Sequence, residues 1–93
     1  MLASVVELAA ISAPEGVAVT ADGNRVVLDF PHLQSVLEMW KPLGSASKRR
    51  ASLDKIQETL ERIGIAVELR VQGKSLGGFG PGEHSGLIQR LIA

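Results

Sequence analysis

The stretch IAVELRVQGKSLGGF, residues 65–79, decides the fold class. Apolar residues occupy every second position from 65 to 71, and charged, polar or small residues occupy the positions between them. This period of two predicts a strand with one buried face and one face in water. Gly73 provides a turn into a return strand that ends at Phe79.

A second stretch of this kind, GVAVTADGNRVVLDF, occupies residues 16–30. Its two arms are separated by Asp22-Gly23, which predicts a type I′ turn because both central residues of that turn need a positive φ. Two hairpins in one chain predict an α+β fold with a four-stranded, mainly antiparallel sheet. We expect the helices on one face of that sheet, and the other face to be partly solvated through Arg25, Asp29, Glu68 and Arg70.

Helical spacing of apolar residues follows each hairpin. After Pro31 it places four apolar residues on one stripe: Leu33, Val36, Leu37 and Trp40. A second stripe comprises Leu53, Ile56, Leu60 and Ile63, after a capping serine (Ser45, Ser47 or Ser52) and before Gly64 as the terminating glycine. A last helix follows GPGE, with Glu83 at its positive end. We expect these helices on one face of the sheet, and the spacing in residues 2–12 fits either a helix or a strand.

The two hairpins resemble each other closely enough to suggest an internal duplication of the form (α)ββα. Each opens with glycine, a β-branched residue, alanine and valine, and each return strand ends at phenylalanine shortly before a histidine. The half-repeats would be residues 1–44 and 45–93, related by a pseudo-two-fold axis. The whole chain, 1–93, is expected to form a single domain.

Composition excludes several classes of function. The chain has no cysteine, which excludes disulfide scaffolds, thiolate zinc sites and thiol catalysis. Only three aromatic residues occur, which disfavours base stacking on single-stranded nucleic acid. No apolar run approaches the length of a membrane span, and the first residues lack the basic region of a secretory signal. We therefore expect a cytoplasmic protein without a membrane span.

The glycine-rich run LGGFGPGEHSG, residues 76–86, is a candidate anion or nucleotide site, with Gly80, Gly82 and His84 as the binding residues. Backbone N–H groups before a helix can bind phosphate. The run lacks the lysine and serine or threonine of a phosphate-binding loop and the glycine spacing of a dinucleotide site. We favour a structural role, in which Gly77 and Gly78 allow a bulge or a close backbone approach in an edge strand.

The basic run SASKRRAS, residues 45–52, is a second candidate site. Lys48, Arg49 and Arg50 could contact nucleic acid or an acidic partner, as part of a basic segment that spans 41–55. The run also has the Arg-Arg-x-Ser form that basophilic kinases favour, ending at Ser52. Basic residues in the first turn of a helix oppose its dipole, so their presence there costs some stability. That cost favours a role for them in binding. A solvated surface is the simpler interpretation.

No catalytic constellation stands out, so we expect a non-enzymatic protein-interaction or adaptor domain without cofactor or metal. Trp40 is interpreted as a core residue, or as an interface anchor if part of its ring is exposed. His32 and His84 are a weak metal signal and are expected to cap helices instead. The partner is expected to be a protein or a second copy of the chain, with nucleic acid as the alternative.

Overall fold

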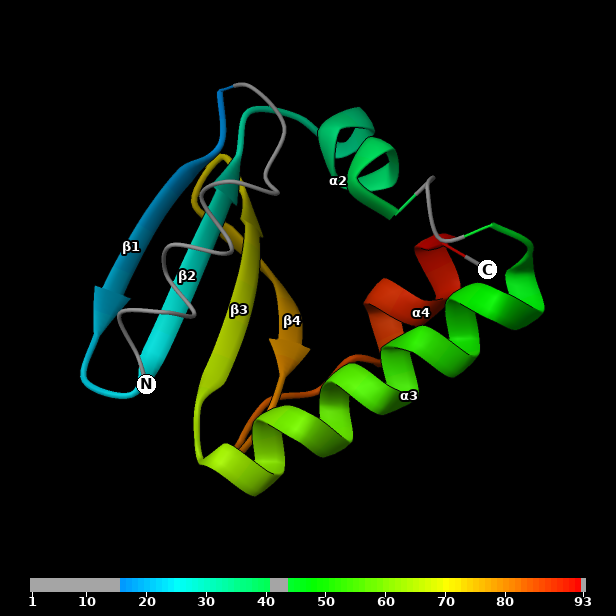
Figure 1. The fold of residues 1–93 in the computed structure, drawn as a ribbon. Coiled ribbons are helices and arrows are strands. Elements are labelled where there is room, and N and C mark those ends of the chain that lie inside the picture. Colours follow the sequence, from blue (N-terminus) through cyan, green and yellow to red (C-terminus); the bar gives the residue numbers. More distant parts are fainter. Residues whose placement is uncertain (1–15, 41–43, 93) are drawn as a thin grey trace.

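The computed structural model describes residues 16–40 and 44–92 as an α+β fold, as the sequence predicts (Figure 1). Its elements are β1 (Ala18–Asp22), β2 (Arg25–Phe30), α2 (Leu33–Trp40), α3 (Ala46–Ile63), β3 (Ala66–Val71), β4 (Lys74–Phe79) and α4 (Gly86–Ile92). The segment 2–12, which the sequence left open between helix and strand, lies outside the described residues.

The four strands form one mixed sheet in the order β1–β2–β3–β4. β1 pairs antiparallel with β2, and β3 with β4, which confirms both predicted hairpins. The hairpins meet through β2 and β3, which run parallel from Arg25 opposite Ala66 to Phe30 opposite Val71. Parallel neighbours need a crossover, and α2 and α3 provide it by returning the chain to the end of the sheet where β2 begins.

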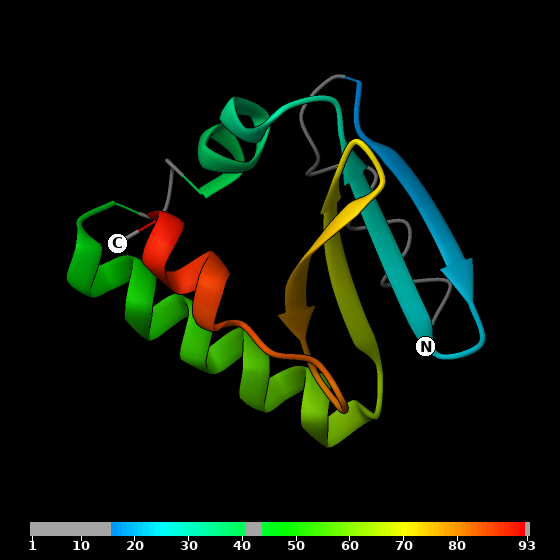
Figure 2. The same ribbon diagram turned by 180° about the vertical axis from the view of Figure 1, so that it is seen from behind.

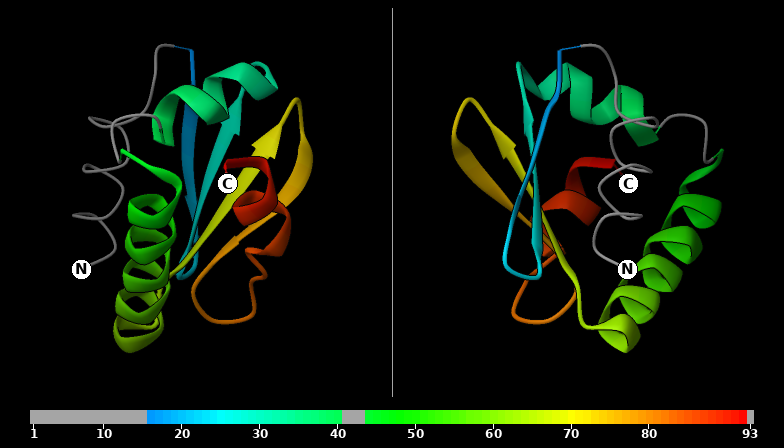
Figure 3. Two further views of the ribbon diagram at one scale, coloured as in Figure 1. Left: turned by 90° about the vertical axis from the view of Figure 1, so that its right-hand side faces the viewer. Right: turned by 60° about the vertical axis from the view of Figure 1, so that its left-hand side comes forward.

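The expected pseudo-two-fold axis between the halves is wrong. An axis perpendicular to the sheet reverses strand direction and would make the two middle strands antiparallel, whereas β2 and β3 are parallel. A two-fold axis in the plane of the sheet and parallel to the strands would keep β2 and β3 parallel, but it would place the helices of the two halves on opposite faces. The described helices occupy one face of the sheet (Figure 3). The duplication of the sequence itself stays a prediction.

The first turn differs from the expected one by one residue. Asp22 pairs with Arg25, so Gly23 and Asn24 are the central residues. Of these two only Gly23 has a positive φ, of 61°, which is the pattern of a type II′ turn instead of type I′. The Asn24 side chain donates to the Gly64 carbonyl at 2.9 Å, and this contact with the end of α3 favours the observed register.

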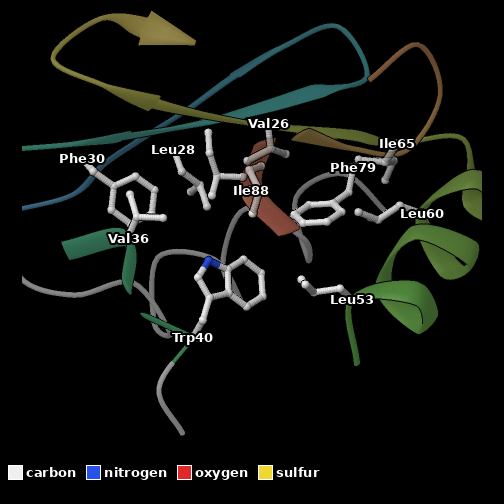
Figure 4. Close-up of a cluster of buried hydrophobic side chains, with 11 residues drawn as sticks. Val26, Leu28, Phe30, Val36, Trp40, Leu53, Leu60, Ile65, Phe79 and Ile88 are labelled. Carbon is white, nitrogen blue, oxygen red and sulfur yellow. The ribbon is translucent and has the colours of Figure 1, made fainter. Parts of the chain in front are cut away.

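All three described helices pack against one face of the sheet, as expected (Figures 2 and 3). The hydrophobic core lies between that face and the helices (Figure 4). Its buried side chains are Val26, Leu28, Phe30, Val36, Trp40, Leu53, Leu60, Ile65, Leu69, Phe79 and Ile88. β1 contributes only half-buried side chains to this core, so it is the most weakly enclosed strand.

The helix ends follow local capping rules. Ser45 caps α3, because its hydroxyl accepts the Lys48 N–H at 3.4 Å. Gly64 ends α3 with a φ of 74°, as predicted. Before α2, His32 accepts the Ser35 N–H through Nδ1 at 3.3 Å, so this histidine caps a helix as expected.

The last helix begins later than predicted. α4 starts at Gly86, so Glu83 does not lie at its first turn. The residues in between are held elsewhere, since the His84 carbonyl accepts the Gly78 N–H at 2.9 Å. The Glu83 carboxylate instead faces Arg25, at 3.7 Å.

Candidate functional site

The face of the sheet opposite the helices carries a charged cluster built on Glu68 of β3. Its Oε2 accepts from Arg70 Nε at 3.0 Å, and its Oε1 accepts from Arg70 and from Arg25 at 3.1 Å each. The Glu68 side chain is 7% exposed, whereas the side chains of Arg25 and Arg70 are 43% and 39% exposed. The two arginines therefore cover the carboxylate and tie β2 to β3.

The cluster holds Glu68 in its ionised form. Hydrogen bonding from Arg70 is the main cause that lowers the pKa of Glu68 from 4.5 to about 2, and burial acts in the opposite direction. Glu68 in turn raises the pKa of Arg70. A carboxyl group with this pKa is a poor general acid or base near neutral pH. The cluster is therefore suited to holding strands together.

This face of the sheet is expected to be partly solvated, and the wet face that alternation predicts for β3 is wrong at Ala66 and Glu68. Glu68 is 5% exposed and Ala66 is 4% exposed, and Val27 of β2 is buried on the same face. The long side chains of Arg25 and Arg70 contact the Glu68 carboxylate and shield it from water, while their own charged ends stay partly accessible. Alternation in the sequence marks which face a residue is on, but does not say what its neighbours cover.

The β4 edge of the sheet is closed to a further strand. Gly78 donates its N–H to the His84 carbonyl, so the chain after β4 folds back along this edge. A register shift interrupts the β3–β4 ladder, and Gly77 has a φ of 94°. A Cβ on Gly77 would collide with the His84 carbonyl, and one on Gly78 with the Val67 carbonyl. The bulge and the close approach predicted for these two glycines are confirmed.

The β1 edge is regular. All five residues of β1 pair with β2 without a bulge. In a two-residue hairpin the residues beside the turn form a hydrogen-bonded pair, so Ala18, Thr20 and Asp22 bond to β2. The N–H and C=O groups of Val19 and Ala21 therefore point outward. Among residues 16–40 and 44–92 no strand pairs with this outer side.

The anion-site candidates meet in the turn after β4, and several of their backbone groups are engaged there. Gly80 donates its N–H to Gln57 Oε1 at 2.9 Å and accepts the Glu83 N–H at 3.2 Å. The His84 carbonyl is engaged by the edge of β4. Gly80 and Gly82 have φ of 93° and 79°, conformations that glycine adopts readily. This geometry favours the structural interpretation of the run.

The basic candidates lie in the first turns of α3. Lys48 and Arg50 are exposed, and Arg49 is half-buried with an Nε that has no hydrogen-bond partner among the described residues. Consecutive helical residues point about 100° apart, so these three cations do not share one direction. Ser52, the residue of the kinase-like motif, is half-buried within the same helix. Lys41 lies outside the described residues.

Trp40 lies in the core, the first of its two expected roles. It is 7% exposed, and its ring meets Phe79 edge-on at a centroid distance of 5.9 Å. Its Nε1 is buried and has no hydrogen-bond partner among the described residues. Trp40 therefore stabilises the contact between α2 and β4.

Within residues 16–40 and 44–92, no group of three or more His, Cys, Asp or Glu side chains could hold a metal ion. None of the described helices is both long enough and apolar enough to cross a membrane.

Comparison of the chain with protein-family models, with curated proteins and with solved structures finds no match. Its function has to be inferred from its own geometry. The sequence analysis did not identify Val19 and Ala21 as residues of the sheet edge, or Gln57 as a partner of the glycine-rich run. The direction of backbone N–H and C=O groups leaves no pattern in the side chains, and no short motif predicts the order of strands in a sheet. Gln57 binds a loop that lies 23 residues further along the chain.

Proposed function

We propose that this chain is a small, non-enzymatic protein-interaction domain that binds an extended segment of its partner along the outer edge of β1. The observation that carries the proposal is the difference between the two edges of the sheet. The edge at β4 has a bulge, close-packed glycines and a returning loop. The edge at β1 has none of these features among the described residues. Such devices prevent unwanted strand pairing, and their absence favours pairing at β1.

Strand addition would use the main chain for affinity and alternate side chains for selectivity. Val19 and Ala21 supply outward donors and acceptors to an incoming strand. On the helical side that strand would meet Val17 and Val19, which are half-buried. On the opposite side it would meet Thr20 and Asp22, which are exposed. These neighbours favour a partner segment in which apolar and polar residues alternate.

The proposal is tested by panning random-sequence peptides against the folded domain and titrating the recovered peptides by amide NMR. We expect the largest shift changes at Val19 and Ala21. We also expect Ala21→Pro to abolish binding, because proline removes an outward N–H and leaves the hairpin's own hydrogen bonds in place.

Ala21→Val is the matched control, since it keeps the N–H and raises the strand propensity. Binding should survive in this variant. Peptides that shift amides only on other elements, or that bind Ala21→Pro as well as the wild type, would show that the β1 edge is not the binding surface.

A second candidate is a weak binder of nucleic acid or of an acidic partner through the basic segment 41–55. The observation that favours it is the first turn of α3, which has no acid and contains bases that oppose the helix dipole. A gel shift at low salt tests this candidate. Binding that the double change Arg49→Ala and Arg50→Ala removes would support it, and no shift with DNA or RNA would eliminate it.

A further inference from the structure

We propose that the strand received by β1 is the β1 strand of a second copy of this chain, paired antiparallel about a two-fold axis at Thr20. The inference rests on the proposed function, because it needs the same outer edge of β1, and it identifies the partner. The resulting dimer would have one continuous eight-stranded sheet.

The register follows from the outward groups of β1. With the axis at Thr20, Val19 of each copy lies opposite Ala21 of the other, and both residues have outward N–H and C=O groups. The pair of strands would therefore exchange four hydrogen bonds. Ala18 would lie opposite Asp22 of the other copy, so all five residues of β1 are used. An axis perpendicular to the sheet keeps the helices of both copies on the same side.

Charge and side-chain packing favour this axis. Asp22 is the charged residue of β1, and the register places it opposite alanine instead of a second aspartate. An axis moved to Asp22 would place the two carboxylates face to face, which destabilises a sheet. The two Thr20 side chains would meet at a position without cross-strand hydrogen bonds, where side chains are closest, and Thr–Thr pairs are favourable there.

The closed edge at β4 limits the assembly to two copies. Pairing of β1 from one copy with β4 from the next would be head-to-tail and would extend without end. The fold-back of His84 onto Gly78 blocks that arrangement. With the β1 edge regular and the β4 edge blocked, the sheet is extended by pairing β1 with β1 of a second copy, and this gives a closed dimer.

The test uses the absence of cysteine from the sequence. Thr20→Cys introduces a single thiol that should face its own symmetry mate, at a cross-strand distance compatible with a disulfide. We expect rapid oxidation to a covalent dimer at dilutions where Thr59→Cys, on the exposed surface of α3, stays monomeric. Equal cross-linking of the two variants would contradict the register.

The uncross-linked protein provides the second measurement. Light scattering over a dilution series should give a dimer for the wild type and for Ala21→Val. Ala21→Pro removes two of the four intermolecular hydrogen bonds, and we expect the dimer dissociation constant to rise about thirtyfold. Val19→Pro, at the other outward position, is the alternative variant if Ala21→Pro does not fold.

The outcomes separate this inference from the proposed function. A monomeric wild type whose β1 edge still binds selected peptides overturns the inference and keeps the proposed function. A dimer that both proline variants leave intact also overturns the inference, because another surface then joins the copies. A monomer whose β1 edge binds no peptide overturns both.

Discussion

Replacement of Glu68 by glutamine tests whether the charged cluster stabilises the sheet. Glutamine keeps the shape of the side chain but removes its charge, and it leaves Arg25 and Arg70 without their shared counter-ion. We expect a lower free energy of unfolding and the loss of one component of its pH dependence. The hydrophobic core between the helices and the sheet is on the opposite face and should be unaffected.

The magnitude follows from the ionisation of Glu68. A pKa lowered from 4.5 to about 2 corresponds to about 3 kcal/mol at neutral pH. The two arginines are 43% and 39% exposed, and screening by water reduces the expected loss to about 1–2 kcal/mol. For a domain of this size such a loss lowers the melting temperature by roughly 5–15 °C.

The sign of the pH dependence is fixed by the direction of the shift. The folded protein holds the carboxyl group at a lower pKa than the unfolded chain does. The stabilisation is therefore complete above the unfolded pKa of 4.5 and is lost as the pH falls toward about 2. Wild type and Glu68→Gln should differ at pH 7 and converge at the acid end of this range.

The assay is urea unfolding at pH 7 and at acid pH, followed by the fluorescence of Trp40, the single tryptophan of the chain. Glu58→Gln is the matched control, because Glu58 forms an exposed i,i+4 pair with Arg62 at 3.2 Å. That change should cost less than about 0.5 kcal/mol. A difference between wild type and Glu68→Gln that is the same at both pH values would refute the reasoning.

Three further substitutions test the packing. Gly78→Ala should lower the free energy of unfolding by at least about 3 kcal/mol, because its Cβ would collide with a β3 carbonyl. Gly82→Ala has open space around its Cβ and should cost only about 1–2 kcal/mol, which comes from the positive φ of Gly82. Chemical denaturation compares the two variants. Gln57→Ala should cost about 1 kcal/mol and speed hydrogen exchange at the Gly80 amide, and unchanged exchange would contradict the contact. Trp40→Ala should cost about 3–5 kcal/mol by circular dichroism without changing the mass found by light scattering, and a changed mass would place this residue at an interface.

The elements of the fold were predictable from local patterns. Alternation over residues 65–71 and the turn at Gly73 give the second hairpin, and helical spacing gives α2 and α3. Gly64 marks the end of α3 because a left-handed residue there satisfies the helix end. Each of these signals depends on residues that are near one another in the chain.

The sheet order and the charged cluster depend on distant residues and could not be predicted in this way. When β3 is considered alone, the alternation of its residues assigns Glu68 to the wet face. It is buried because Arg25, 43 residues away, lies beside it once β2 and β3 pair. The outward backbone of β1 became a candidate surface for the same reason, since only the strand order shows that β1 is at an edge.

The parallel contact between β2 and β3 has a consequence for how the molecule assembles. Each hairpin closes over a two-residue turn, which takes microseconds in isolated hairpins. The contacts that join the hairpins link residues such as Asn24 and Gly64, which are 40 positions apart, so they carry a larger loop-closure entropy. We expect the outer strand pairs to form first, and the centre of the sheet, the best enclosed part of the native protein, to be completed last.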